Sequence, residues 1–224
     1  MKKNYYLLRA SLFLIALMFV RNNSFGFEVS VGGLLYEISG GTACLRGPVD
    51  LGIEKCDIPE SVTYQGVAYP VTAIADYAFR LNSSEGCTSL TSVNIPSSVT
   101  SIGDFTFCNC TSLTSVNIPS SVTSIGDGTF YGCTSLTSVD IPSSVTELDG
   151  TFENCTSLTS VNIPNSVTDL GWSTFENCTS LTSVNIPNSV TSMRETFKGC
   201  TSLTSVNIPY SVTLLGFSTF YNCI

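Results

Sequence analysis

Cysteine is the residue type in this chain whose spacing could support chemistry. Seven of the ten cysteines recur at intervals of 22 or 23 residues. These are Cys87, Cys110, Cys133, Cys155, Cys178, Cys200 and Cys223. Thiols repeated in this way could form disulfides or bind a metal ion. Because an odd number of parallel side chains cannot pair fully, we expect a column of small buried thiols instead.

Three further cysteines lie outside this column. Cys44 and Cys56 precede the regular repeats, and they could form a disulfide in an oxidising compartment or remain free. The position of Cys108 is occupied in later repeats by Tyr131, Glu153, Glu176, Lys198 and Tyr221. Because such residues are rarely buried completely, we expect Cys108 to be an exposed thiol.

Catalytic groups are hard to find in this sequence. It contains no histidine, which excludes Ser-His and Cys-His nucleophiles and histidine metal sites. Asp76, Asp104 and Asp127 fall in one column, which could bind Ca²⁺ or cap turns. No further acidic residues join them, so we expect turn capping. We therefore predict no enzyme activity, no catalytic residue, no metal site and no cofactor.

The repeat that positions these side chains is clearest in residues 110–132, CTSLTSVNIPSSVTSIGDGTFYG. Leu113, Val116 and Ile118 follow the L-x-x-L-x-L pattern of a leucine-rich repeat, which contributes one short strand per turn. Pro119 has no N–H to donate and should end that strand. The next turn is expected at Gly126, where glycine would allow positive φ.

Stacking is required for these repeats to fold, since one copy buries too little apolar surface to order its own backbone. No long helical pattern is present, so the return segment of each repeat should consist of short turns, 3₁₀ pieces or a second strand. The sequence predicts a β-rich repeat solenoid of the leucine-rich repeat type. It should have one short strand per 22–23 residues, little or no long helix, and an N-terminal β-hairpin cap.

Four segments are expected along the chain. Residues 1–26 resemble a signal peptide, with basic residues before an apolar run at 12–20 that is too short to span a bilayer. Residues 27–55 should form the N-terminal β cap, and 56–86 an irregular first repeat with insertions. Residues 87–224 are the regular repeats, and the last turn is incomplete.

Charge narrows the range of partners. The net charge is −8, and it becomes −12 once the four basic residues of the signal are removed. This balance argues against nucleic-acid binding, which requires a basic surface, and against adsorption to anionic membranes. We expect a secreted, extracellular or cell-surface protein that does not insert into a membrane after signal removal.

Two surfaces could contact a partner. The strand face repeats serine and asparagine, and its candidate contact residues are Ser115, Asn117, Asn162 and Asn185. The return segments carry the aromatic candidates Phe105, Tyr131, Trp172, Phe217 and Tyr221. A hydrated polar ladder and local packing between turns are the alternative interpretations. The uncapped C-terminal end is a third candidate surface, suited to self-association.

The string SLTSVNIPSSVTSIGDGTFYGC, with Ile-Pro after the strand and Phe-x-x-Cys closing each turn, resembles the BspA-like leucine-rich repeat family. The resemblance covers about residues 27–224. Members are typically secreted or surface proteins of gut and oral bacteria and of some mucosal protozoa, and some are adhesins. The resemblance implies adhesin-like contact with a protein or glycan on a host or neighbouring cell. The alternative is a structural spacer or self-associating solenoid with no specific ligand.

Overall fold

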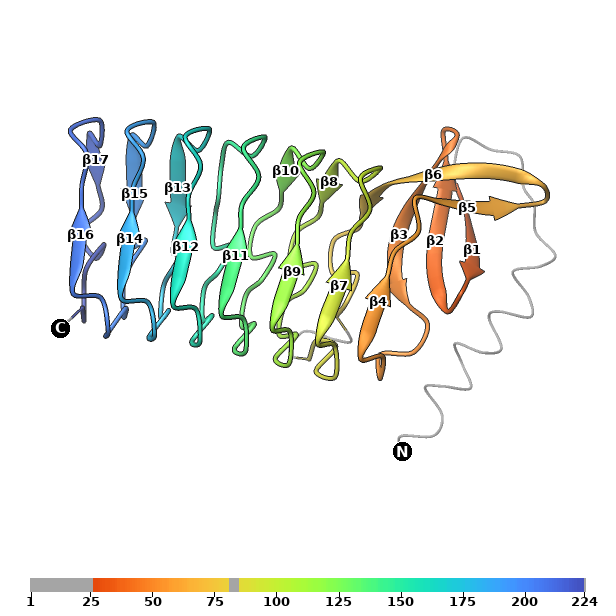
Figure 1. Cartoon of the computed structure of the whole chain (residues 1–224), viewed down its shortest axis with the longest axis horizontal. Helices are drawn as coiled ribbons and strands as arrows, with labels where there is room; N and C mark the ends of the chain where they lie inside the picture. Colours follow the sequence, from red (N-terminus) through yellow and green to blue (C-terminus); the bar gives the residue numbers. More distant parts are fainter. Residues whose placement is uncertain (1–25, 81–84, 224) are drawn as a thin grey trace.

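The computed structural model describes residues 26–80 and 85–223. It is an elongated stack of coils that runs from an N-terminal β cap to the C-terminal end (Figure 1). The described residues form strands and turns and contain no helix. The predicted repeat solenoid is confirmed, whereas residues 1–25 of the expected signal peptide lie outside the described residues.

The cap contains three antiparallel strands rather than a single hairpin: β1 (Phe27–Val31), β2 (Leu34–Ser39) and β3 (Thr42–Pro48). The turn between β1 and β2 is the pair Gly32-Gly33, with φ of +59° and +80°. Consecutive positive φ values suit a tight two-residue hairpin. Strand β3 then pairs in parallel with β6 (Val67–Ile74), so the cap continues directly into the stack of coils.

Each coil contributes one strand to the face that the sequence predicted. In chain order these are β4 (Lys55–Asp57), β7 (Ser92–Asn94), β9 (Ser115–Asn117), β11 (Ser138–Asp140), β12 (Ser160–Asn162), β14 (Ser183–Asn185) and β16 (Ser205–Asn207). They form two parallel sheets, β4-β7-β9 and β11-β12-β14-β16. Like residues pair with like, as in Val93 with Val116 and Val139 with Val161.

The return side also contains strands, which settles the alternatives that the sequence left open. They are β8 (Ser101–Ile102), β10 (Ser124–Ile125), β13 (Asp169–Trp172), β15 (Ser192–Arg194) and β17 (Leu214–Leu215). The insertion around Gly66 forms an antiparallel hairpin between β5 (Ser61–Tyr64) and β6. The strands β3, β6, β8 and β10 lie side by side in one sheet, here called the return sheet.

Stacked aromatic rings form the centre of the core. The series is Phe79, Phe107, Phe130, Phe152, Phe175, Phe197 and Phe220. Adjacent ring centroids are 4.9–5.7 Å apart. The first six rings are completely buried. Since each ring contacts the rings of the coils before and after it, every coil depends on its neighbours for burial.

The predicted positive φ at Gly126 is wrong. The positive φ in this turn belongs to Gly128, at +57°. Gly126 is needed because a Cβ there would lie 2.5 Å from the Asp104 nitrogen and 2.6 Å from the Gly103 carbonyl carbon. Its role is therefore close approach between coils, and the backbone could accept another residue if there were space.

Glu60 joins the irregular first repeat to the next coil. Its carboxylate accepts hydrogen bonds from the Ser97 hydroxyl and the Ser98 N–H, each at 2.9 Å. These bonds hold the pKa of the Glu60 carboxyl below its ordinary value. The carboxylate form therefore stabilises the folded state.

We expect Glu60→Gln to lower the free energy of unfolding at neutral pH. Because the folded pKa is depressed, the contribution of Glu60 is present above the ordinary glutamate pKa and is lost as the pH falls through the folded pKa. Urea denaturation at several pH values should show the two proteins converging in acid. The exposed Glu54→Gln is the matched control, and an equal gap at acidic pH would contradict the assignment.

Candidate interaction surfaces

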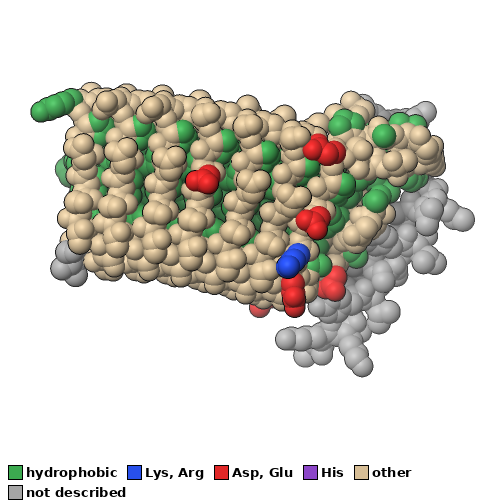
Figure 2. Space-filling view, in the orientation of Figure 1, with side chains coloured by type: hydrophobic (Ala, Val, Ile, Leu, Met, Phe, Trp, Pro, Cys, Tyr) green, Lys and Arg blue, Asp and Glu red, His purple; other side chains and the backbone are tan. Residues whose placement is uncertain are grey.

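The strand face is polar and almost uncharged. The predicted contact residues Ser115, Asn117, Asn162 and Asn185 are all exposed, and the valines between them are buried. Side chains other than Lys, Arg, Asp and Glu cover most of the middle coils in Figure 2. Asp140 is the acidic exception in the asparagine column. This face offers hydroxyl and amide groups at a regular spacing.

A ladder of threonines makes the edge of this face rigid. The Thr114 hydroxyl donates to the Thr91 carbonyl at 3.2 Å, and the Thr159 hydroxyl donates to the Thr137 carbonyl at the same distance. The hydroxyl of Thr204 repeats the contact one coil further along, to the carbonyl of Thr182. Part of the polar surface is therefore used to connect coils, as the hydrated-ladder interpretation expects.

Phe105 and Tyr131 lie in local packing on the return side. The Phe105 ring is parallel to that of Tyr77, with centroids 5.5 Å apart, and it lies 6.5 Å from the Tyr131 ring. Phe105 also covers Gly128, where a Cβ would be 2.4 Å from its ring. Both predicted residues are half-buried. Most of the Phe105 surface is therefore already in contact with neighbouring coils.

Trp172 is different, because it is 52% exposed although it sits in a β-strand. Its backbone N–H donates to Asp149 Oδ1 at 2.7 Å, and the Arg194 guanidinium lies 5.7 Å from the ring centroid. A tryptophan with an arginine over its face is typical of interaction hot spots. Phe217 and Tyr221 are also exposed and lie in the last coil.

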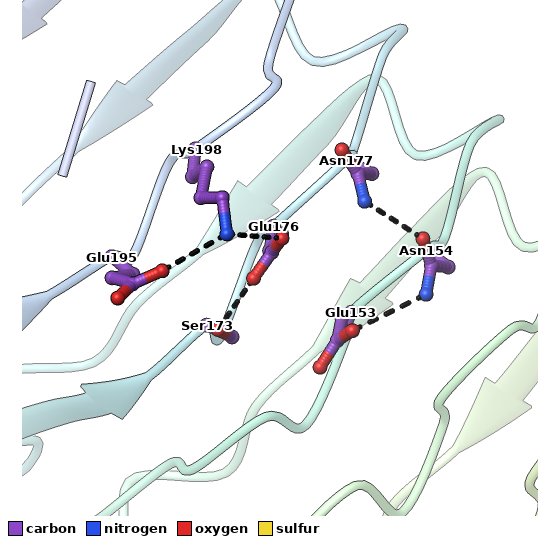
Figure 3. A network of polar contacts seen from close by, with 7 residues as sticks. All are labelled: Glu153, Asn154, Ser173, Glu176, Asn177, Glu195 and Lys198. Carbon is purple, nitrogen blue, oxygen red and sulfur yellow. Dashed lines mark hydrogen bonds and ion pairs between the residues drawn. The ribbon is translucent and has the colours of Figure 1, made fainter. Parts of the chain in front are cut away.

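A polar network connects four coils on the closing side of the repeats (Figure 3). Lys198 Nζ lies 3.1 Å from both Glu176 and Glu195. The Asn177 amide donates to the Asn154 amide oxygen at 3.0 Å, and the Asn154 amide donates to Glu153. Burial, together with the charge of Glu176, raises the pKa of the Glu153 carboxyl. These groups satisfy one another, so the network acts as a structural connection between coils.

The aspartate column caps turns, as the sequence predicted. The Asp104 N–H donates to Asp76 Oδ1 and the Asp127 N–H donates to Asp104 Oδ1, both at 2.9 Å. In residues 26–80 and 85–223, no group of three or more acidic, cysteine or histidine side chains is placed to hold a metal ion. Nothing in these residues points to catalysis.

The cysteine column is buried and every described thiol is free. Each thiol points at a phenylalanine carbonyl of the preceding coil. The Sγ–O distances for Cys133, Cys155 and Cys178 are 3.2 Å. Burial raises the pKa of Cys87 and of Cys200 to about 12. The column therefore consists of protonated thiols that fill the core, and Cys44 and Cys56 are not joined to each other.

The prediction that Cys108 is exposed is wrong, since its exposed fraction is 3%. The chain approaches it after the insertion that follows Arg80. A Cβ on Gly86 would lie 2.1 Å from the Cys108 carbonyl oxygen. The regular repeats have no such insertion, so their residues at this position gave a misleading comparison.

We expect thiol reagents to distinguish two classes of cysteine. Cys44 and Cys223 are half-buried and should react in the native protein, whereas the other eight should react only after unfolding. Timed alkylation followed by peptide mass spectrometry measures this directly. Early labelling of Cys133 or Cys155 would contradict the buried column, and complete labelling in urea serves as the control.

No helix in the described part of the chain has the length and apolar character needed to cross a membrane.

Comparison with known proteins agrees with this architecture. A family model described as a BspA type leucine-rich repeat region matches residues 52–150, 72–196 and 193–224, in six copies. No curated protein matches.

Solved structures of bacterial proteins are similar over most of the chain. The leucine-rich repeat protein of T. pallidum is 30% identical with a TM-score of 0.76, over 88% of this chain and 89% of that one. A leucine-rich cell surface protein from Faecalibacterium prausnitzii is 35% identical with a TM-score of 0.75, over 88% of this chain. A leucine-rich repeat protein from Eubacterium ventriosum is 25% identical with a TM-score of 0.72, over 90% of this chain. The match spans only 52% and 50% of the last two proteins.

The family model covers well over half of the sequence, and the stacked coils, the parallel strand face and the phenylalanine ladder agree with the solved relatives. The chain therefore belongs to the BspA-type leucine-rich repeat family.

Proposed function

We propose that this protein is secreted or displayed at the cell surface and makes adhesin-like contact with a protein or another cell. The observation that carries the proposal is the exposed Trp172 beneath the Arg194 guanidinium on a rigid return sheet. Exposing a large aromatic ring to water is unfavourable, and tryptophan paired with arginine is enriched where proteins bind partners.

The rest of the molecule supports a binding role. Each coil is hydrogen-bonded to the next, so a partner would meet a pre-organised surface and little conformational entropy would be lost on binding. The similar protein from Faecalibacterium prausnitzii is described as a cell surface protein. The predicted signal peptide would deliver this chain to the same side of the membrane.

A binding assay with a matched pair of variants tests this function. The purified chain is applied to immobilised extracellular-matrix proteins and to intact epithelial and bacterial cells, with an unrelated acidic solenoid as background. We expect specific retention that Trp172→Ala reduces at least about tenfold, because hot-spot truncation costs about 2 kcal/mol or more. The exposed Asn165→Ala is the control. Retention no higher than background would reject the proposal.

A second candidate function is self-association through the last coil. Ile208, Leu215 and Phe217 are 42%, 50% and 113% exposed, and β16 and β17 each pair with one neighbour in the described residues. A layer of this kind can be covered by a further coil or by a second copy of the chain. Light scattering over a concentration series, with Leu215→Lys as the non-associating variant, separates a spacer that assembles from a monomeric binder.

A further inference from the structure

A groove of about 420 Å³ lies on the return sheet next to the cap, away from Trp172. Its floor is one outward-facing row across β3, β6, β8 and β10, formed by Cys44, Ala73, Ser101 and Ser124. Four strands at the usual spacing give a length of about 14 Å. Both the volume and the length suit a small ligand rather than a second protein.

This groove is specific to the junction between cap and repeats. All four floor side chains are short, and the neighbouring Gly103 and Gly126 have none. In the next two coils the floor position holds Glu147 and Asp169, which are longer and charged. The groove therefore ends where the regular acidic residues begin, and it is not simply repeated along the solenoid.

One wall carries carboxylates in fixed orientations. Asp76 Oδ1 accepts the Asp104 N–H and Asp104 Oδ1 accepts the Asp127 N–H, both at 2.9 Å. An ionised carboxylate has lone pairs for several further hydrogen bonds, so both can accept from hydroxyl groups of a ligand. On the other side Arg46 lies 3.7 Å from Glu37, a long contact between half-exposed groups that leaves guanidinium donors for a ligand.

An aromatic surface adjoins the same wall. Tyr77 and Phe105 directly follow Asp76 and Asp104 in the sequence, and their rings are parallel at 5.5 Å. Their φ values of +57° and +50° are rare for bulky residues. Tyr77 remains 46% exposed. An exposed ring beside oriented carboxylates and serine hydroxyls offers an apolar face together with hydrogen-bond acceptors and donors.

We propose that this groove binds a short neutral glycan. Sugar rings present apolar C–H faces to an aromatic ring and hydroxyl pairs to carboxylates, and both groups are in place here. Asp76 and Asp104 are not balanced by the Arg46–Glu37 pair, so an anionic glycan would be repelled. The proposal names a ligand for the surface contact described under the proposed function, and in that sense rests on it, but it uses a different site.

Isothermal titration calorimetry on the purified chain tests the groove with lactose, cellotriose, N-acetylchitotriose and mannotriose, and with sialyllactose as the charged counterpart. We expect saturable binding of at least one neutral sugar and none of sialyllactose. Asp104→Asn keeps the Oδ1 acceptor for Asp127 and should lower the affinity about tenfold, because a hydrogen bond to a charged group is lost. Ser101→Phe should abolish binding by filling the floor, whereas the same exchange at Ser138 on the strand face should not affect it.

Cys44 supplies a site-specific reporter, since its thiol lies in the groove wall and is half-buried. A bound neutral sugar should slow alkylation of Cys44 and leave Cys223 unchanged. No binding by any neutral sugar, full binding by Ser101→Phe, or binding of oligolysine in place of sugars would overturn the proposal. Trp172→Ala should bind the sugar normally, so failure of the Trp172 contact and failure of the groove are separate results.

Discussion

Phe152→Ala is expected to lower the free energy of unfolding by about 3–5 kcal/mol, the usual range for removing a buried phenylalanine. Phe152 is completely buried in the middle of the ring ladder. Its centroid lies 5.6 Å from that of Phe130 and 5.7 Å from that of Phe175, with both pairs nearly parallel. The substitution therefore removes two ring contacts and leaves a cavity between coils.

The position of the cavity also affects cooperativity. Solenoid stability is approximately a sum of coil and interface terms, so a weak interface in the middle can let the two halves unfold separately. Urea denaturation should be followed by circular dichroism for the whole chain and by fluorescence of the single tryptophan, Trp172, which lies on the C-terminal side of the cavity. We expect the two transitions to separate in Phe152→Ala and to coincide in the parent protein.

The matched control is Phe220→Ala, which removes the same side chain from the half-buried end of the ladder. It loses one ring contact, with Phe197, and should destabilise the protein less. Equal effects at the two positions would show that burial along the ladder does not determine the stability of the coils.

The repeating part of the fold could be predicted because spacing alone aligns each coil with the next. The Leu, Val, Ile and Phe columns of residues 110–132 are all buried, as the L-x-x-L-x-L pattern required. The second strand, such as Ser101–Ile102, could not be predicted with the same certainty. A two-residue strand has no periodicity of its own, and it is defined by pairing with a neighbouring coil.

The candidate sites show the same limit. The environments of Trp172 and Phe105 differ because Gly128 leaves space that the Phe105 ring fills, while Trp172 has an arginine over its face. Nothing in the two local sequences distinguishes them. The groove was missed because Cys44 and Ser101 belong to distant segments that only the parallel pairing of β3 with β6 and of β6 with β8 brings together.

Gly126→Ala is expected to be the most damaging single-methyl substitution in the regular coils, and it should lower the free energy of unfolding by about 1–3 kcal/mol or more. The added Cβ would lie 2.5 Å from the Asp104 nitrogen and 2.6 Å from the Gly103 carbonyl carbon, which are backbone atoms of the preceding coil. The two coils would have to separate. That movement would stretch the hydrogen bond from the Gly126 N–H to the Ile102 carbonyl, now 2.9 Å.

Gly66→Ala provides the opposite case and therefore the control. Its φ of +81° disfavours alanine, but a Cβ there would meet nothing within 4 Å. Its cost should be the conformational penalty of about 1–2 kcal/mol, with no change in how coils stack. Thermal and urea unfolding of both variants separate backbone strain from crowding. Asp104→Ala should not rescue Gly126→Ala, because the backbone atoms of residues 103 and 104 still occupy the space. Rescue would mean that the carboxylate alone sets the distance between these coils.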